Sequence, residues 1–193
     1  PVYQGERAGF GGTEVGVSVI IRGPQQSIEK KESVMGFALS DMQLTSTAFD
    51  DGGVIPSQYT GVGVDVSPAL SWTGAPAETK AFAVICHDPD APLVSPGGTY
   101  GFVHWVLYNI PGSTSGLGEG SSDFTNGKND FGNEAYGGPM PPEGHGKHRY
   151  YFWVLALDKE IELEAGLTMW QLLARVEANL IGMNRMVGTF ERA

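Results

Sequence analysis

The chain has 193 residues, a net charge of −10 at pH 7 and a pI near 4.7. Binding to nucleic acid needs a basic face that displaces counterions, so this charge argues against a nucleic-acid partner. The apolar runs all fall short of the roughly 18–20 residues that a membrane span needs, which predicts a soluble protein without a transmembrane segment.

The single cysteine, Cys86, excludes an internal disulfide and a thiolate metal cluster. A lone thiol fits a reducing compartment, and we therefore expect a cytoplasmic location. The residues after Pro1 show no basic start followed by an apolar core, as a signal peptide would. Because the sequence opens at Pro1 rather than at Met, a cleaved leader and a periplasmic location stay open as the alternative.

Residues 1–34 differ in composition from the rest of the chain. They are rich in glycine and contain four basic and four acidic residues, so the net charge of −10 belongs to residues 35–193. Residues 15–21 could form one strand. We interpret residues 1–34 as an N-terminal extension and residues 35–193 as the folded domain, with a functional N-terminal arm as the alternative.

The predicted domain consists of short strands separated by turns. A weak alternation of apolar and polar residues covers 42–49, and a short strand is predicted at 69–72. Three runs are almost continuously apolar and rich in β-branched and aromatic residues, which is typical of strands covered on both faces: 81–86, 103–110 and 150–157. With no helix expected between them, the fold class is all-β dominated, an antiparallel β-sandwich.

One stretch near the C-terminus has the pattern of a helix. Thr168 can cap its first turn, and Gln171 three positions later completes a capping box. Apolar residues then recur at helical spacing up to Gly182, where a glycine is typical of a helix end: Leu172, Leu173, Val176, Leu180 and Met183. The prediction therefore includes one C-terminal helix.

All four histidines lie between positions 87 and 148, close to the edges of the three apolar strands. Asp88 follows the run over 81–86 in a segment stiffened by prolines. The same residues are also typical of a turn that binds no ligand. His104 interrupts an apolar strand; such a histidine is most often a core residue with a satisfied hydrogen bond, and Asp88 is its expected partner. His148 begins a buried strand after a loop with three prolines, and such a rigid loop would preorganise a site at the strand ends.

Two other interpretations of these residues stay open. Two histidines and a carboxylate, His104, His148 and Asp88, could ligate a metal. The spacing gives no support for this, so neither a metal nor a cofactor is predicted. A His/Asp pair could also supply the general base of a hydrolase, but no serine or threonine is fixed beside the pair by sequence and Cys86 lies within a strand, so no catalytic residue is predicted.

Several motifs follow one another from about Met35 to the C-terminus in a specific order and spacing: Asp88-Pro-Asp-Ala-Pro92, His104-Trp-Val-Leu-Tyr-Asn-Ile-Pro111, Asn129-Asp-Phe-Gly132, Tyr136-Gly-Gly-Pro139, Pro141-Pro142, Gly144-His-Gly146, His148-Arg-Tyr150 and Val187-Gly-Thr-Phe-Glu-Arg192. Together they resemble the phosphatidylethanolamine-binding protein family, specifically its bacterial Raf-kinase-inhibitor-like branch. Residues 1–34 have no counterpart in this resemblance.

The resemblance implies a β-sandwich of a large and a small antiparallel sheet, with a pocket at one end that accepts phosphate-like anions and headgroups. Imidazole N–H groups and loop amides would face the phosphate, while Asp88 would orient His104 or receive an ammonium group. The residues that the resemblance implies for ligand binding are Asp88, Asp90, His104, Gly138, Met140, Pro142, His148 and Tyr150.

The sequence departs from the family pattern in three places. Met140 stands where many bacterial relatives have a cysteine, residues 93–101 are longer than is typical, and the chain ends at Ala193 without the further helix of animal relatives. These differences bear on the size of the ligand and on any interaction with a kinase.

The function predicted from these features is that of a non-enzymatic, regulatory binding protein whose partner is a small anionic ligand or a phospholipid headgroup. The alternative is an interaction protein that inhibits a kinase or a protease through the exposed Pro141-Pro142 loop, and the third hypothesis is the hydrolase. A homodimer is left open.

Overall fold

The computed structural model describes residues 39–91 and 101–193. The boundary at residue 35, the strand expected at 15–21 and most of the long segment over 93–101 lie outside these residues. Within the described part, no helix has both the length and the apolar character that a membrane span requires.

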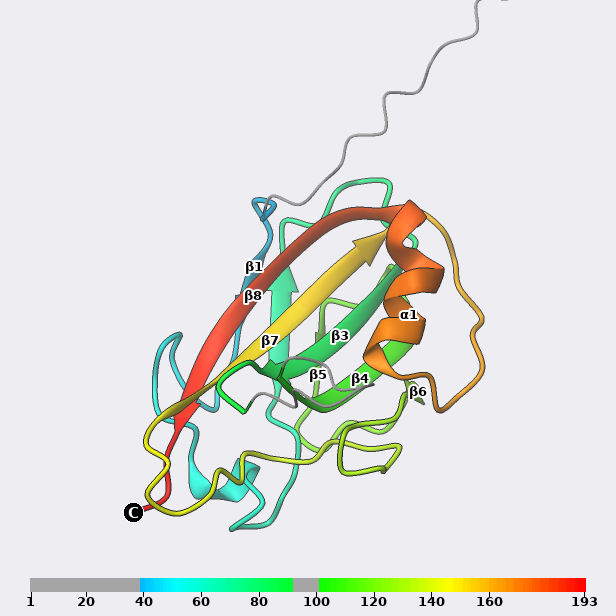
Figure 1. The fold of residues 1–193 in the computed structure, drawn as a ribbon. Coiled ribbons are helices and arrows are strands. Elements are labelled where there is room, and N and C mark those ends of the chain that lie inside the picture. Colours follow the sequence, from blue (N-terminus) through cyan, green and yellow to red (C-terminus); the bar gives the residue numbers. More distant parts are fainter. Residues whose placement is uncertain (1–38, 92–100) are drawn as a thin grey trace, which may run out of the picture. The chain divides into compact units, whose positions relative to one another are not determined.

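A five-stranded sheet forms the larger layer, and its neighbouring strands are all antiparallel (Figure 1). β3 lies at its centre, because it pairs with β4 on one side and with β7 on the other. In spatial order the strands are β6 (Thr125–Asn126), β4 (Phe102–Pro111), β3 (Ala81–Asp88), β7 (His148–Leu157) and β8 (Leu180–Phe190). The three runs predicted as buried strands are therefore the three middle strands of this sheet.

A three-stranded antiparallel sheet forms the smaller layer: β1 (Gln43–Thr45), β2 (Leu70–Thr73) and β5 (Gly116–Leu117). The rings of Trp72 on β2 and Phe82 on β3 pack with centroids 5.3 Å apart, which joins the two sheets. The predicted antiparallel sandwich of a large and a small sheet is confirmed. The strand expected over 42–49 contributes only the three residues of β1 to the sheet.

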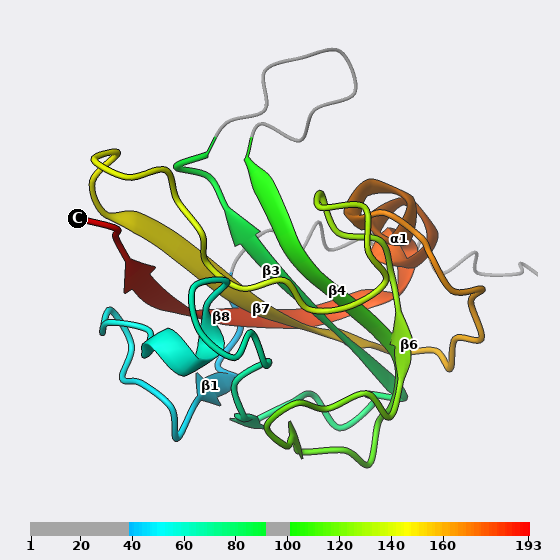
Figure 2. The same ribbon diagram turned by 90° about the horizontal axis from the view of Figure 1, so that it is seen from below.

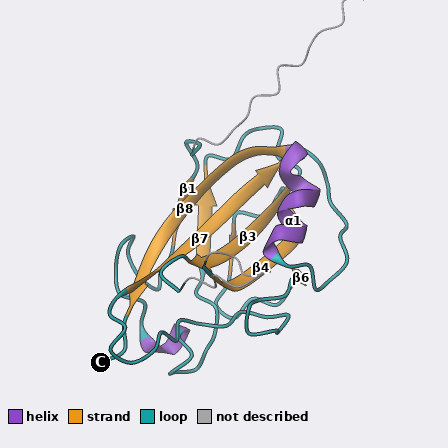
Figure 3. Ribbon diagram, in the orientation of Figure 1, coloured by secondary structure: helices purple, strands orange, loops and turns teal. Residues whose placement is uncertain are grey.

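Both faces of the large sheet are covered, which explains why its middle strands are almost continuously apolar. One face packs toward the small sheet through large buried side chains such as Trp105 and Phe152. The other face packs against the helix α1 (Met169–Val176) through residues such as Val106 and Leu172 (Figure 3). Two short 3-10 turns, η1 (Ser57–Tyr59) and η2 (Glu177–Asn179), complete the described elements.

The helix begins where the sequence predicts but ends earlier. The Thr168 side chain accepts a hydrogen bond from the backbone N–H of Gln171, and the Gln171 side chain accepts one from the backbone N–H of Thr168, so the capping box is present. α1 stops at Val176, and Leu180 is already the first residue of β8.

The prediction of a helix up to Gly182 is therefore wrong. Leu180 and Met183 pack against the same core as α1, so they share its apolar environment from a strand, and the helical spacing is accidental. Gly182 faces Pro76, where a Cβ would come within 3.1 Å of the proline ring. This glycine permits a close approach of β8 and does not end a helix.

Candidate functional site

β3 ends where β4 and β7 begin, at one end of the large sheet (Figure 2). Each of these three strands contributes a polar side chain to this end. Asp88, His104 and His148 are only 1%, 3% and 2% exposed. All three line one cavity of about 310 Å³. The antiparallel order of the middle strands brings together residues that are up to 60 positions apart in the sequence.

The sequence predicts that Asp88 pairs with His104, but in the structure Asp88 pairs with His148. Its Oδ2 accepts a hydrogen bond from His148 Nδ1 at 2.8 Å, and its Oδ1 accepts one from the backbone N–H of Asp90 at 2.8 Å. Asp88 lies opposite Phe102 in the register, and the His104 ring, two residues further along β4, hydrogen-bonds to a different partner. Both carboxylate oxygens of Asp88 are thus already hydrogen-bonded.

The partner of His104 is the backbone. Its Nδ1 lies 2.6 Å from the carbonyl oxygen of Gly137, and because a carbonyl can only accept, Nδ1 carries the proton. Burial lowers the pKa of His104, and the carbonyl of Gly137 and the charge of Asp88 offset part of this effect. His104 is therefore a neutral imidazole whose Nε2 has a free lone pair.

His148 has the same tautomer, because its Nδ1 donates to the carboxylate of Asp88. Its Nε2 lies 3.4 Å from Nδ1 of His145, an exposed residue in the loop before β7. The chain Asp88–His148–His145 thus runs from the buried end of β3 to the protein surface.

Tyr150 completes the polar floor of the cavity. Its ring centroid lies 5.1 Å from that of His104 and 6.5 Å from that of His148, and its hydroxyl is buried without a hydrogen-bond partner among the described residues. Burial raises its pKa, so the hydroxyl stays neutral and able to donate. A buried hydroxyl without a partner costs about 1–3 kcal/mol, which a ligand atom in the cavity could recover.

The walls of the cavity are apolar, and they contain residues that the sequence did not assign. Phe102 lies two positions before His104 on the same face of β4, and alternation along the strand could have identified it. Phe131 and Met140 are 46% and 50% exposed, so they form an apolar mouth. The other lining residues are Ala91, Pro141, Pro142 and His145.

Two of the predicted ligand-binding residues do not line the cavity. The Asp90 carboxylate accepts hydrogen bonds from the backbone N–H and the guanidinium of Arg149, at 2.9 and 3.3 Å. The backbone N–H of Gly138 donates to Asp65 at 2.6 Å, and that of Gly137 donates to the carbonyl of His104 at 2.9 Å. These two backbone N–H groups are thus engaged within the protein, and contact of Asp90 and Gly138 with a ligand stays a prediction.

Few of the residues that line this cavity could take part in catalysis. Among the described residues, no serine, threonine or cysteine lines this cavity, and no cluster of three metal-ligating side chains is present. Cys86 is fully buried, and burial raises the pKa of its thiol well above the usual range.

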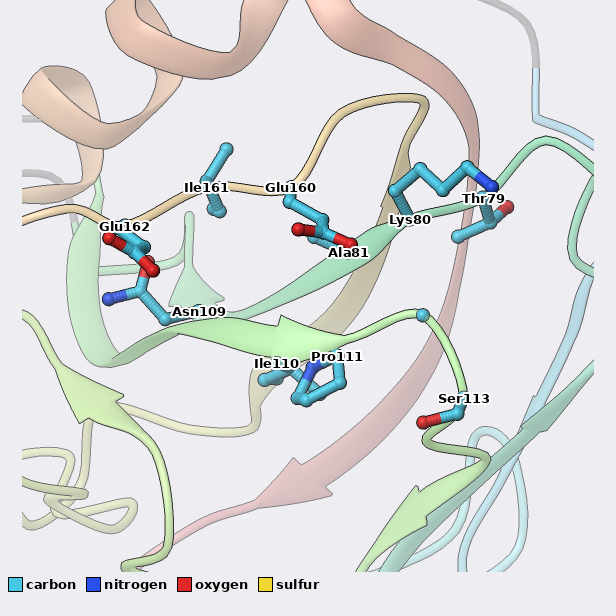
Figure 4. A pocket seen from close by; sticks show the side chains of 11 residues that line it. Thr79, Lys80, Ala81, Asn109, Ile110, Pro111, Ser113, Glu160, Ile161 and Glu162 are labelled. Carbon is cyan, nitrogen blue, oxygen red and sulfur yellow. The ribbon is translucent and has the colours of Figure 1, made fainter.

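A second, larger cavity of about 480 Å³ lies at the opposite end of the large sheet, between the ends of β3 and β4 and the loop over 160–162 (Figure 4). Its charged side chains, Lys80, Glu160 and Glu162, are exposed. The amide of Asn109 is engaged with the side chain of Thr125 and with the backbone of Leu163, at 2.8–3.0 Å. This cavity is a surface groove, and the half-buried amide of Asn109 in its wall is already satisfied.

In the described residues the fold is a β-sandwich of two antiparallel sheets with one short α-helix. Buried carboxylate and imidazole groups lie at one strand end of this sandwich, as in a ligand-binding protein. The chain belongs to the phosphatidylethanolamine-binding protein family, whose sequence model matches residues 45–191.

Relatives support this assignment over the described domain. The UPF0098 protein of Methanothermobacter thermautotrophicus is 40% identical over 158 residues, which are 78% of this chain and 99% of that protein. A crystal structure of a phosphatidylethanolamine-binding protein homologue from Chlamydia trachomatis matches with a TM-score of 0.72 at 38% identity, covering 79% of this chain and 98% of that one. The E. coli protein YbcL matches with a TM-score of 0.72 at 30% identity, covering 80% of this chain and all of its own.

Proposed function

We propose that this protein binds a small phosphate-type anion, free or as part of a headgroup, in the cavity at the β3–β4–β7 end, and that occupancy of the cavity serves a regulatory role. The observation that carries the proposal is the buried Tyr150 hydroxyl, which has no partner among the described residues and belongs to a side chain that lines the cavity beside two anchored imidazoles. Buried polar groups in folded proteins are nearly always hydrogen-bonded, so an unpartnered one at a cavity favours a ligand there.

The size and walls of the cavity limit the ligand. A volume of about 310 Å³ is at the small end of ligand pockets, so it fits a headgroup rather than a whole lipid. The exposed apolar mouth formed by Phe131 and Met140 suits a ligand whose charged end enters the cavity while an apolar part stays at the surface.

The residues proposed to contact the ligand are those at the floor and mouth of the cavity: Asp88, His104, Met140, Pro142, His148 and Tyr150. Asp90 and Gly138 are proposed to act indirectly, by holding Arg149 and the loop before β7. The Asp88–His148 pair has the geometry of a base and its orienting carboxylate, but the absence of a hydroxyl or thiol nucleophile from the described lining favours binding over hydrolysis.

The test is calorimetric titration with inorganic phosphate and with phosphoethanolamine, comparing the wild type with Tyr150→Phe. We expect dissociation constants on the order of micromolar to millimolar and weaker binding of both ligands by the variant. Tyr108→Phe is the matched control, because the Tyr108 hydroxyl is buried on the other face of the sheet and donates to the carbonyl of Glu164. No binding by the wild type, or equal loss in both variants, would contradict the proposal.

A further inference from the structure

The anion cavity has no permanent positive charge among the residues that the structure describes. None of its lining residues is a lysine or an arginine. The two guanidinium groups near it are engaged elsewhere, Arg149 with Asp90 and Arg192 with Glu143, at 3.3 and 2.8 Å. A doubly charged oxyanion in this cavity would therefore meet no fixed cation.

The cavity is also short of hydrogen-bond donors, because of the tautomers of the two buried imidazoles. Both Nδ1 protons are used, by the carbonyl of Gly137 and by the carboxylate of Asp88. The remaining ring nitrogens of His104 and His148 are then acceptors in the neutral state. A fully deprotonated oxyanion would face lone pairs, and a hydrogen bond to either ring nitrogen needs one more proton.

We propose that the cavity binds its anion together with one proton, held between a ligand oxygen and Nε2 of His148, with Asp88 as the counter-charge. This inference rests on the proposed function and adds that the site selects oxyanions that carry or acquire a proton, such as a phosphomonoester monoanion. The complex then forms from the protein, the anion and a proton from solvent, and the ligand is released as the pH rises.

His148 is the better site for this proton than His104. A carboxylate that hydrogen-bonds to an imidazole stabilises the imidazolium, as in other Asp–His pairs. His104 instead faces a backbone carbonyl, and burial opposes its charge, which agrees with its lowered pKa.

Other charged and titratable groups surround His148. From β4 comes His104, and from β7 itself Tyr150 and Arg149. The loop after β3 carries Asp90, the loop before β7 carries Glu143, His145 and Lys147, and Glu191 and Arg192 follow β8. Among the described residues, Asp88 is the charged group that hydrogen-bonds to the His148 ring, while Nδ1 of His145 lies 3.4 Å from its Nε2.

The test is the number of protons taken up on binding, measured by calorimetric titration with phosphate at pH 6 to 8.5 in two buffers of different ionisation enthalpy. Sulfate serves as a second probe, because it carries no proton in this range. We expect uptake that approaches one proton as the pH rises, and an affinity that falls toward tenfold per pH unit. Uptake with sulfate would place the proton on His148, and uptake with phosphate alone would place it on the ligand oxygen; both support the proposal.

Binding of phosphate without proton uptake and with an affinity independent of pH would overturn this inference while leaving the proposed function intact. A wild type that binds neither anion at any of these pH values would overturn the proposed function, and this inference with it.

Proton uptake by variants tests whether the proton belongs to the Asp88–His148 pair. Asp88→Asn keeps an acceptor beside His148 but removes the counter-charge, so we expect proton uptake to fall strongly, with at least tenfold weaker binding at pH 6. Asp90→Asn is the matched control, because this neighbouring carboxylate lies outside the lining and contacts Arg149. Retained uptake in Asp88→Asn, or its loss in Asp90→Asn, would overturn the assignment.

Two further variants keep the assignment testable if Asp88→Asn fails to fold. We expect His104→Gln to weaken binding while keeping proton uptake, and His145→Asn to keep it as well, because this exposed ring hydrogen-bonds to no carboxylate among the described residues. Loss of proton uptake in either variant would place the proton on that ring and contradict the proposal. The ¹⁵N shifts of the His148 ring, followed during the titration, report directly on protonation of its Nε2.

Discussion

The two ends of the large sheet each carry a cavity, and the two cavities differ in what their polar groups do. The cavity of about 480 Å³ has exposed charges and an asparagine whose amide is fully engaged. The cavity of about 310 Å³ has a buried carboxylate, two buried imidazoles and a hydroxyl without a partner. The smaller cavity is the better candidate because the polar residues that line it are buried at a cost, whereas volume alone requires no ligand.

The largest effect is expected for Asp88→Ala. This change leaves the buried Nδ1–H of His148 without its acceptor, and we expect a cost at the upper end of about 1–3 kcal/mol because the lost acceptor is a carboxylate. Urea denaturation should show a loss of that size in the free energy of unfolding. The control is Glu164→Ala, whose ion pair with Arg175 is exposed, and which should cost less than about 1 kcal/mol. Similar losses in both variants would remove the distinction between a buried site and ordinary surface charge.

Tyr108 and Tyr150 are both fully buried but should respond differently to loss of the hydroxyl. Tyr108→Phe leaves the carbonyl of Glu164 and the N–H of Leu167 without their partner, so unfolding should become easier by about 1–3 kcal/mol. Tyr150→Phe removes a hydroxyl that has no partner in the described chain, so stability should be unchanged or slightly higher. Thermal unfolding of the two variants checks this. A loss of stability in Tyr150→Phe would mean that its hydroxyl is satisfied within the protein.

The site end of the sheet should also lower stability in acid. Burial lowers the pKa of His104 in the folded state below the value of about 6.5 that an unfolded chain has. Between these two values the unfolded state binds more protons, so the free energy of unfolding falls as the pH falls below about 6.5, by at most about 1.4 kcal/mol per pH unit for one proton. His87, whose pKa burial also lowers, acts in the same direction.

His104→Gln should therefore flatten part of this pH dependence, measured as unfolding free energy from pH 7.5 to 5. A slope that is unchanged in the variant would show that His104 accepts its proton without cost in the folded state.

The smallest effect is expected at the opposite end. The double substitution Glu160→Gln and Glu162→Gln alters exposed side chains of the larger cavity, so stability should stay within about 0.5 kcal/mol of the wild type. The dissociation constant for phosphate should also be unchanged. A change in phosphate binding would transfer the candidate site from the smaller cavity to the larger one.

The middle of the large sheet could be predicted from the sequence because its strands are covered on both faces. The runs that became β3, β4 and β7 are nearly all apolar, and the turn residues around Asp88 and His148 mark the ends of two of these strands. The polar residues at these strand ends indicated a site, and the resemblance to the family implied that Asp88, His104 and His148 line one pocket.

The partners of these residues could not be predicted, because they depend on register. Asp88 and His148 pair diagonally across β3 and β7, whose register places His87 opposite Tyr151, and no local pattern encodes this register. The strand β8 was missed for a similar reason, since Leu180 and Met183 share an apolar environment with α1 while long-range pairing with β7 decides their conformation.

Whether the cavity at the β3–β4–β7 end binds an oxyanion can be tested by a crystal structure of the protein with tungstate, a heavy analogue of phosphate. We expect an ordered oxyanion in the smaller cavity, within hydrogen-bond distance of Nε2 of His148 and of the Tyr150 hydroxyl. An empty cavity at a saturating concentration, or an oxyanion bound only between the loop over 160–162 and the end of β4, would contradict this expectation.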